Sequence, residues 1–410
     1  MRLLFLSRYG RMGASSRYRL LQYAALFEQE GNQVEIWPLA DDKYLRQLYV
    51  TGQRPVGVLF AGYKRRLQQM SAVRNFDAVI CEQEAFPYLP DGFERLLRNR
   101  ARRLFVDYDD AAYIRYEKIP VLKNKIARLM ASADAVVVGN RYLAMYAEKF
   151  NQRVTVIPSV VDLSRYPVKV KTADSGAVRV AWIGTPITAA LLAPLFPVFE
   201  RLQQKHPEVM FRFIGARKHA TGREILHSAD SAQNDGLFFR VEGPEWSEKT
   251  ETNLLVECDI GIMPLPDTEF TRGKCGLKLI QYMACGLPVV ASPVGANREI
   301  VQHGQNGFLA SNAADWEDAL ACLIVNRDLR ERMGGAARER VEREFTLEKG
   351  FRRWMGVIDR VAAGREGEGN DGDAGIKPAL HAESRDPQIN GVFSTTHRAN
   401  ELSCVDSQDS

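Results

Sequence analysis

The chain has 410 residues, of which 45% are hydrophobic and 26% are charged, and its formal net charge is +4. This is the composition of a soluble globular protein that is long enough for two domains. The six cysteines are scattered and form no Cys-x-x-Cys pair, which argues for a reducing compartment and against a zinc site or a disulfide framework. The opening MRLLFLSRYG has an apolar run of only four residues, so we expect a first strand there, not a signal peptide or a membrane-spanning helix.

Basic residues gather in the N-terminal half of the chain. They include Lys64, Arg65 and Arg66 and a run of arginines between residues 95 and 103. Such runs usually mark solvated helix faces. A more specific, functional interpretation is that these residues are attracted to an anionic membrane surface that carries a lipid-linked acceptor. No recognised nucleic-acid-binding module accompanies the charge, so we expect no nucleic-acid partner. We therefore expect a cytoplasmic protein, with peripheral contact to the inner face of the membrane under the more specific interpretation.

The first elements predict a strand, a glycine loop, a helix and a second strand. We expect the strands over residues 2–7 and 34–39 and the helix over about 16–30, with Gly10 and Gly13 in the loop. Such a unit cradles phosphate or closes over a substrate, although the same pattern also occurs as a plain α/β turn.

An acidic cluster follows the strand expected over residues 103–108. It contains Asp107, Asp109 and Asp110, and the carboxyl ends of strands are where open α/β sheets bind ligands. The cluster could hold a divalent metal, or one aspartate could simply cap the next helix. We favour a third interpretation without metal, in which Asp109 and Asp110 stabilise a cationic transition state or accept a proton from a substrate hydroxyl.

A second alternation of strands and helices begins at residue 178, after a polar stretch at 167–177 that we expect to be a linker. Such alternation implies a parallel sheet with right-handed crossovers. The strands of this half are expected at 178–183, 209–215, 237–242, 260–265 and 289–291.

The stretch 272–300, RGKCGLKLIQYMACGLPVVASPVGANREI, organises this second half. Gly273 and Gly276 let the backbone approach a ligand closely just before a helix. Lys274 and Lys278 share one face of that helix near its positive end, where cations are unfavourable unless an anion binds. Phosphate is the usual anion at such a site, whereas the alternative is that both lysines are simply solvated.

Three segments carry a resemblance to a known family: DIGIMPLPD at 259–267, GKCGLKLIQYMACGLPVVAS, and GANREIVQHGQNGFLA. They resemble the donor-binding half of GT-B glycosyltransferases, and most of all glycosyltransferase family 4, the retaining enzymes that use nucleotide-sugars. The two glutamates typical of that family fall on Gly273 and Gln281, eight positions apart, so neither is acidic in this chain.

The resemblance implies an α/β fold of two Rossmann-like, doubly wound domains that face each other across a cleft, with a C-terminal helix crossing back to the first domain. The implied segments are an acceptor-side domain at 1–166, the linker at 167–177, a donor domain at 178–345, the crossover helix at 346–363 and a disordered tail at 364–410.

The resemblance also implies transfer of a sugar from a nucleoside diphosphate-sugar to the hydroxyl of a glycan or lipid-linked acceptor, with retention, in cell-surface polysaccharide or glycolipid assembly. No cofactor and no metal are expected. The catalytic candidates are Lys278, Lys274, Asp109 and Asp110. The donor-binding candidates are Gly184, Thr185, Gly273, Cys275, Gly276, Leu277, Gln281 and Glu299. The candidates at the acceptor loop are Gly10, Gly13, Arg17 and Arg19.

Two alternatives stay open. One is a nucleotide-sugar 2-epimerase on the same fold, and the other is a non-catalytic protein that binds nucleotide-sugar or scaffolds an assembly. Because no basic residue directly follows Gly184 and Thr185, the diphosphate would depend on Lys274 and Lys278, or on Arg217 and Lys218.

Overall fold

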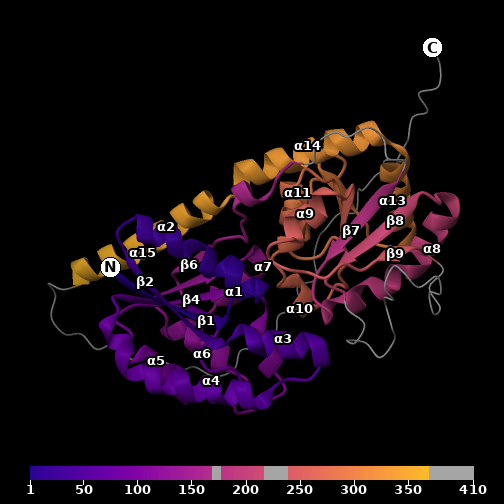
Figure 1. The fold of residues 1–410 in the computed structure, drawn as a ribbon. Coiled ribbons are helices and arrows are strands. Elements are labelled where there is room, and N and C mark those ends of the chain that lie inside the picture. The colour runs from indigo at the N-terminus through magenta and orange to yellow at the C-terminus, as the bar shows by residue number, and fades with distance from the viewer. Residues whose placement is uncertain (169–176, 217–238, 369–410) are drawn as a thin grey trace, which may run out of the picture. The chain divides into compact units, whose positions relative to one another are not determined.

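Two parallel six-stranded sheets form the framework of the computed structural model, which describes residues 1–168, 177–216 and 239–368 (Figure 1). The first sheet has the order β2-β1-β3-β4-β5-β6. Its strands are β1 (Arg2–Tyr9), β2 (Gln33–Ala40), β3 (Ala78–Glu82), β4 (Leu104–Tyr108), β5 (Ala135–Val138) and β6 (Val154–Val156).

The second sheet has the order β12-β11-β10-β7-β8-β9. Starting from β7, the chain first adds β8 and β9 on one side and then β10, β11 and β12 on the other, so the strand order reverses between β7 and β10. Its strands are β7 (Val178–Ile183), β8 (Val209–Ile214), β9 (Val241–Glu242), β10 (Ile260–Met263), β11 (Val289–Ala291) and β12 (Gly307–Leu309). In the first sheet the same reversal lies between β1 and β3. The crevice beside such a reversal is where doubly wound sheets bind ligands.

Helices connect the strands of both sheets. Those of the first half are α1 (Ala14–Arg19), α2 (Ala24–Gln29), α3 (Asp42–Thr51), α4 (Val56–Gln69), α5 (Gly92–Arg98), α6 (Lys125–Ser132) and α7 (Arg141–Ala147). Those of the second half are α8 (Phe196–Lys205), α9 (Glu251–Val256), α10 (Glu269–Arg272), α11 (Leu277–Ala284), α12 (Asn297–Ile300), α13 (Ala313–Val325) and α14 (Arg327–Glu344), followed by α15 (Leu347–Glu368). No helix within the described ranges is long and apolar enough to cross a membrane.

The central strands are apolar because helices cover both of their faces. Every residue of β3 and β4 is buried, and Val79 of β3 pairs in register with Leu4 of β1 and Leu104 of β4. A parallel sheet that is buried on both faces needs such continuous apolar runs. The predicted fold class, two Rossmann-like α/β domains, is confirmed.

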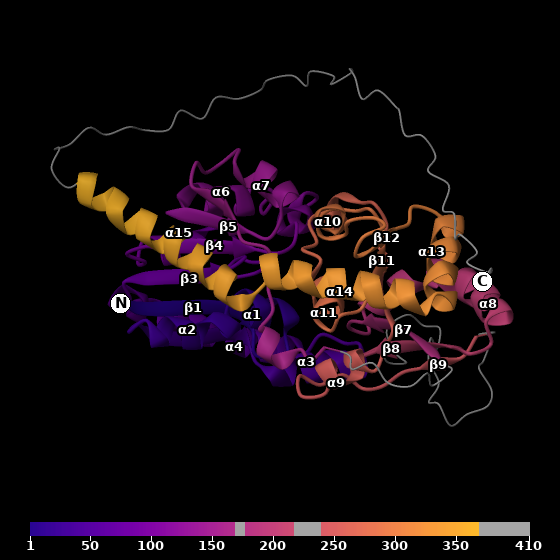
Figure 2. The same ribbon diagram turned by 90° about the horizontal axis from the view of Figure 1, so that it is seen from above.

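The last helix returns to the first sheet. Trp354 and Ile358 of α15 are buried in one apolar cluster with Leu3, Phe5 and Ile80 of β1 and β3. Figures 1 and 2 both show α14 beside the second sheet and α15 over the first. The expected crossover is therefore confirmed. The domain boundaries remain predictions, since most of the linker and residues 369–410 of the expected tail lie outside the described residues.

One predicted helix is wrong in detail. The helix expected over residues 16–30 is divided into α1, a 3₁₀ turn at Leu21–Tyr23 and α2. The segment before α8 is 3₁₀ at Thr188–Leu195, where Pro194 has no N–H for a helical hydrogen bond. The strand predicted at 237–242 is reduced to β9 within the described residues, and β12 was not predicted.

The packing of α15 gives a first prediction. Trp354→Ala removes the largest side chain that α15 buries against the first sheet, so we expect a loss of ~3–5 kcal/mol in the free energy of unfolding. The shift in the urea midpoint measures this loss. Arg352→Ala, at an exposed position of the same helix, is the matched control and should change stability little. A Trp354 variant as stable as that control would mean that α15 does not brace the first sheet.

Candidate functional site

A pocket of about 540 Å³ lies where the carboxyl ends of the two sheets meet. Ile183, Gly184 and Thr185 line it from the end of β7, and Met263 lines it from the end of β10. These two strands flank the reversal of strand order in the second sheet. Residues of the β1–α1 loop, of α1 and of α3 form the opposite wall. The volume is within the ~300–1,000 Å³ range of small-molecule sites.

The start of α11 forms part of this pocket. Gly276 caps the helix with a φ of +67°, and a Cβ atom on it would lie 2.3 Å from Cδ1 of Ile300, so only glycine fits without a shift. The preceding loop is fixed from the first domain, because Asn140 donates hydrogen bonds to the carbonyl oxygens of Gly273 and Lys274, each at 3.0 Å. The Cys275 thiol donates to the carbonyl oxygen of Asp109 at 3.1 Å.

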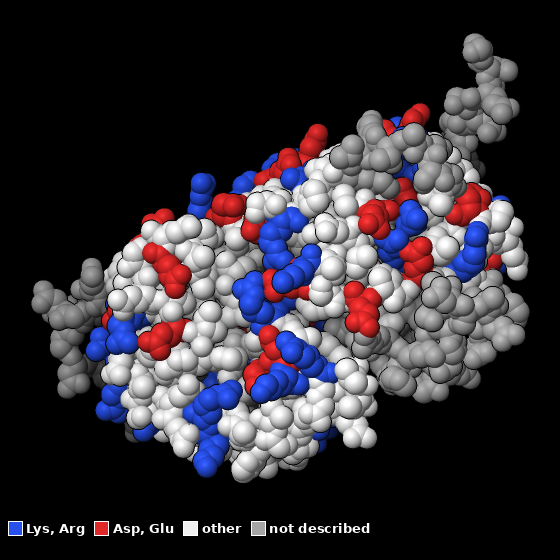
Figure 3. Space-filling model, in the orientation of Figure 1, with Lys and Arg blue, Asp and Glu red and all other residues white. Residues whose placement is uncertain are grey.

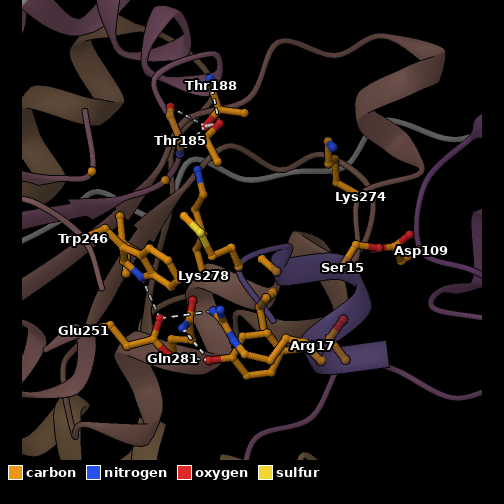
Figure 4. Close-up of a pocket in the computed structure, with 18 of the residues that line it drawn as sticks. Ser15, Arg17, Asp109, Thr185, Thr188, Trp246, Glu251, Lys274, Lys278 and Gln281 are labelled. Atoms are coloured by element: carbon orange, nitrogen blue, oxygen red, sulfur yellow. Dashed lines mark hydrogen bonds and ion pairs between the residues drawn. The ribbon is translucent and has the colours of Figure 1, made fainter. Parts of the chain in front are cut away.

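Lys278 projects from the first turn of α11 and points toward Thr185 and Thr188 (Figure 4). Its Nζ lies 4.2 Å from the centroid of the Trp182 ring, and it makes no ion pair to any residue of the described ranges. Burial, together with the charge of Lys274, lowers the pKa of Lys278 to about 7. A bound anion would favour the charged lysine and reverse this effect.

Lys274 is already paired. Its Nζ lies 2.8 Å from Oδ1 of Asp110, which reaches it from the first domain. Burial raises the pKa of the Asp110 carboxyl, and the charge of Lys274 acts in the opposite direction. The prediction that the two lysines share one helix face is wrong, because Lys274 lies in the loop before α11 and only Lys278 belongs to the helix. They also differ in pairing, since the charge of Lys274 has a local partner and that of Lys278 does not.

The other two aspartates of the acidic cluster are held by different partners. Oδ2 of Asp109 accepts a hydrogen bond from Ser15 Oγ at 2.6 Å, and Oδ1 accepts one from Gln83 Nε2 at 2.8 Å. Both carboxylate oxygens of Asp107 accept from the buried guanidinium of Arg19, at 2.8 and 2.5 Å. Within the described ranges there is no group of three histidine, cysteine or carboxylate side chains placed to hold a metal ion.

A buried polar network closes the floor of the pocket. Gln281 Nε2 donates to the hydroxyls of Tyr18 and Tyr166, at 3.0 and 3.1 Å. The Tyr18 hydroxyl in turn donates to Oε1 of Glu251 at 2.7 Å. Oε2 of that carboxylate accepts a hydrogen bond from Trp246 Nε1 at 2.7 Å. Burial is the main cause of the raised pKa of the Tyr18 hydroxyl.

Arg17 joins the same network from α1. Its guanidinium lies between the rings of Tyr18 and Trp246, 4.9 and 4.8 Å from their centroids, and NH2 is 3.3 Å from Oε2 of Glu251. Because Arg17 belongs to the first domain and Glu251 to the second, the network ties the two halves of the pocket together.

Most of the predicted site residues line this pocket. They are Lys274, Lys278, Asp109, Asp110, Gly184, Thr185, Cys275, Gly276, Leu277, Gln281, Arg17 and Arg19. Their individual roles remain predictions. Four others do not appear in the lining: Gly10, Gly13, Gly273 and Glu299.

The structure gives three of these four a packing explanation. A Cβ atom on Gly10 would lie 2.4 Å from Oδ1 of Asp42, and one on Gly273 would lie 2.7 Å from the amide nitrogen of Ala111. A Cβ atom on Gly13 would meet the side chain of Tyr9 at 2.6 Å. Glu299 is exposed on α12, and the alternative phosphate ligands Arg217 and Lys218 lie outside the described residues.

Several lining residues were not singled out from the sequence. They are Tyr18, Arg46, Tyr49, Val50, Thr188, Trp246 and Glu251. Only Thr188 carried a usable signal, because it closely follows the glycine loop after β7. The others reach the pocket from helices and loops that the sequence places far from α11.

Comparisons with known proteins agree with this architecture. Residues 192–326 match the family model described as "Glycosyl transferases group 1". The D-inositol 3-phosphate glycosyltransferase of Pseudarthrobacter chlorophenolicus is 26% identical over 232 residues, which cover 53% of this chain and 52% of that protein. The N-acetyl-alpha-D-glucosaminyl L-malate synthase of Bacillus anthracis is 37% identical over 76 residues, or 18% of this chain and 20% of that protein. The chain thus spans about half the length, or less, of these curated relatives.

Solved structures match over a larger share of the chain. Sucrose-phosphate synthase from Thermosynechococcus elongatus superposes with a TM-score of 0.64 and 14% identity, covering 89% of this chain and all of that one. Anabaena HepE in complex with UDP-glucose superposes with a TM-score of 0.63 and 16% identity, covering 88% of this chain and 100% of that one. The chain has the GT-B fold. It resembles glycosyltransferase family 4, as the motif around α11 predicted.

The environment of Lys278 predicts how stability depends on pH. Its pKa of about 7 in the folded protein lies below the ordinary lysine value of 10.5, so the folded state binds fewer protons than the unfolded state between these values. The resulting cost to stability is fully present below pH 7 and disappears as the pH rises toward 10.5. We therefore expect Lys278→Met to stabilise the protein at pH 6 and to have a smaller effect at pH 9.5.

Urea unfolding of both proteins at the two pH values measures this difference. Lys249→Met, at an exposed position, is the matched control and should show the same effect at both pH values. If Lys278→Met changes stability equally at pH 6 and pH 9.5, the assignment of a depressed lysine pKa to this pocket is wrong.

Proposed function

We propose that the protein transfers a sugar from a nucleoside diphosphate-sugar to an acceptor hydroxyl. The observation that carries this proposal is Lys278, a lysine without an ion-pair partner in the described residues, which points into the pocket at the start of α11. A helix start with free N–H groups and an uncompensated cation is a site for an anion, and phosphate is the usual one. The named relatives that act on sugars, and the UDP-glucose in the HepE structure, support a sugar nucleotide as the source of that phosphate.

In this proposal the bond between the anomeric carbon and the diphosphate breaks, and negative charge grows on the leaving group. Lys278 and the backbone N–H groups of residues 275–277 face that charge from fixed positions. Such preorganised groups act at little reorganisation cost, and loss of one typically costs ~3–4 kcal/mol of transition-state stabilisation. Lys274 contributes less, because Asp110 already compensates its charge.

The wall from the first domain takes the acceptor. Asp109 and Asp110 line the pocket from the first domain, where a carboxylate can stabilise an oxocarbenium-like sugar or accept the proton of the acceptor hydroxyl. Ser15 and Gln83 fix the orientation of Asp109. Asp107 takes no part in this proposal, since it does not line the pocket and Arg19 donates to both of its oxygens.

The finer parts of the proposal follow from the family resemblance. They are retention of the anomeric configuration, a glycan or lipid-linked acceptor, and a role in cell-surface polysaccharide or glycolipid assembly. Peripheral contact with an anionic membrane is proposed from the basic residues of the N-terminal half instead. The epimerase alternative receives no support from the relatives that match this chain.

Nucleotide binding tests the proposal. We expect one of UDP, GDP, ADP or dTDP to raise the melting temperature of the protein without magnesium, because a ligand at 100 times its dissociation constant adds ~2.7 kcal/mol of stability. Lys278→Ala should remove most of this stabilisation, whereas Lys249→Ala should retain it. If no nucleotide raises the melting temperature, the proposed donor site is wrong. If the melting temperature rises only when magnesium is present, the donor site is metal-dependent.

A further inference from the structure

We propose that the outer face of α3 and α4 docks on an anionic lipid bilayer. The face is formed by four exposed apolar side chains, Val50, Val56, Phe60 and Leu67, and by the basic residues around them. We call it the α3–α4 face. The docking itself needs neither donor nor acceptor, whereas its use for a lipid-linked acceptor rests on the function proposed above.

After Asp42, the first residue of α3, the sequence of this segment is one-sided in charge. Residues 43–76 contain no aspartate or glutamate. The same residues contain seven basic ones: Lys43, Arg46, Arg54, Lys64, Arg65, Arg66 and Arg74. A stretch of this length with a single sign of charge lacks the opposite charges that usually accompany lysine and arginine on a solvated helix face.

The apolar side chains on this face are unusually exposed. Val56 is 72% exposed and Phe60 71%, while Val50 is 57% and Leu67 46% exposed. Val56, Phe60, Lys64 and Leu67 follow one another at intervals of four, four and three residues, so they lie on one side of α4. Contiguous exposed apolar side chains with a charged rim mark an interaction surface.

The inner sides of the same helices are packed in the ordinary way. Val58 and Leu59 of α4 lie against a small apolar cluster that includes Tyr44 and Leu45 of α3. Arg66 is buried and donates to the backbone carbonyl oxygens of Ser7 and Trp37, so it belongs to this inner side as well. Val56 and Phe60 are therefore exposed although the other side of α4 is packed against the domain.

The remaining basic residues stay at the surface. Lys43, Arg46, Arg54, Lys64, Arg65 and Arg74 are exposed, and none of them forms a salt bridge to a described residue. Figures 1 and 2 place α3 and α4 side by side, and Figure 3 shows largely uncharged surface over these helices, with lysine and arginine and a few acidic side chains beside it. Apolar side chains at the level of the lipid headgroups, with cations next to them, suit an anionic bilayer.

A bilayer fits this surface better than a nucleic acid does. Binding of single strands depends on several exposed aromatic rings on which bases stack. Phe60 is the only aromatic side chain of the α3–α4 face, and the other three apolar members are aliphatic. Insertion of aliphatic side chains among acyl chains lowers the free energy, and these side chains cannot stack on bases.

The face continues into the pocket. Arg46, Tyr49 and Val50 of α3 line the pocket near Arg17 and Trp246. Val50 of α3 thus belongs both to the exposed apolar surface and to the lining of the pocket. Docking of this face would place the acceptor side of the pocket next to the lipid headgroups, where the sugar or phosphate of a lipid-linked acceptor is found.

Co-sedimentation of the full chain with vesicles tests the docking in the absence of any substrate. We expect binding to vesicles of phosphatidylcholine with phosphatidylglycerol, little binding to phosphatidylcholine alone, and weaker binding as salt rises. The double variant Val56→Ser/Phe60→Ser should lower the partition coefficient at least about tenfold. Arg54→Gln/Lys64→Gln should lower it about fivefold for each charge removed.

The matched controls are Val325→Ser, which is 62% exposed at the end of α13, and Arg332→Gln, which is exposed on α14. Both should bind vesicles like the unchanged protein, and unaltered melting temperatures show that all variants fold. Equal binding to both vesicle types, or full binding by the Val56/Phe60 variant, would overturn the proposal. Binding of a single-stranded oligonucleotide with the same dependence on Phe60, and none to vesicles, would assign the face to nucleic acid instead. Because these measurements use no sugar nucleotide, the docking can fail while the transferase proposal stands.

Discussion

The pocket depends on a buried set of hydrogen bonds that joins the two domains. Gln281 of α11, Tyr18 of α1 and Glu251 of α9 are linked through hydroxyl groups at 2.7 to 3.0 Å, and Arg17 and Trp246 complete the set. Each of these polar groups would be costly to bury without its partners. The two sheets therefore hold their carboxyl ends at a fixed separation, and a ligand-sized space remains between them.

The same network explains a departure from the family pattern. A glutamate at position 281 would offer only acceptors to the tyrosine hydroxyls and would place a second negative charge close to Glu251. The amide of Gln281 instead donates to both Tyr18 and Tyr166. The loss of the first glutamate has a steric explanation as well, since Gly273 lies too close to Ala111 for any side chain. In this chain both positions serve the contact between domains, and the proposed phosphate site depends on Lys278.

The sequence was sufficient for the fold and for most residues that line the pocket, and insufficient for the network. The anion site itself stays a prediction. Alternating apolar runs and glycine loops predicted both sheets, and the spacing of Gly276, Lys274 and Lys278 predicted a phosphate site at the start of a helix. The pairing of Gln281 with Tyr18 joins residues 263 positions apart, and no local pattern signals it. Nor does a local pattern distinguish Lys278 from Lys274, since only the structure shows that Asp110 compensates one of them. The break of the helix expected over residues 16–30 has the same origin, because tertiary contacts of Tyr18 and Arg19 override local helix propensity.

The central claim is that this pocket binds a nucleotide-sugar and breaks the bond to its diphosphate. The most direct test is release of the nucleoside diphosphate from UDP-, GDP-, ADP- and dTDP-sugars by the unchanged protein, by Lys278→Met and by the control Lys249→Met. The account predicts that one class of donor is cleaved, that the control cleaves it equally well, and that Lys278→Met lowers kcat by ~10²–10³. Equal turnover by Lys278→Met and the unchanged protein, or no cleavage of any donor, would contradict it.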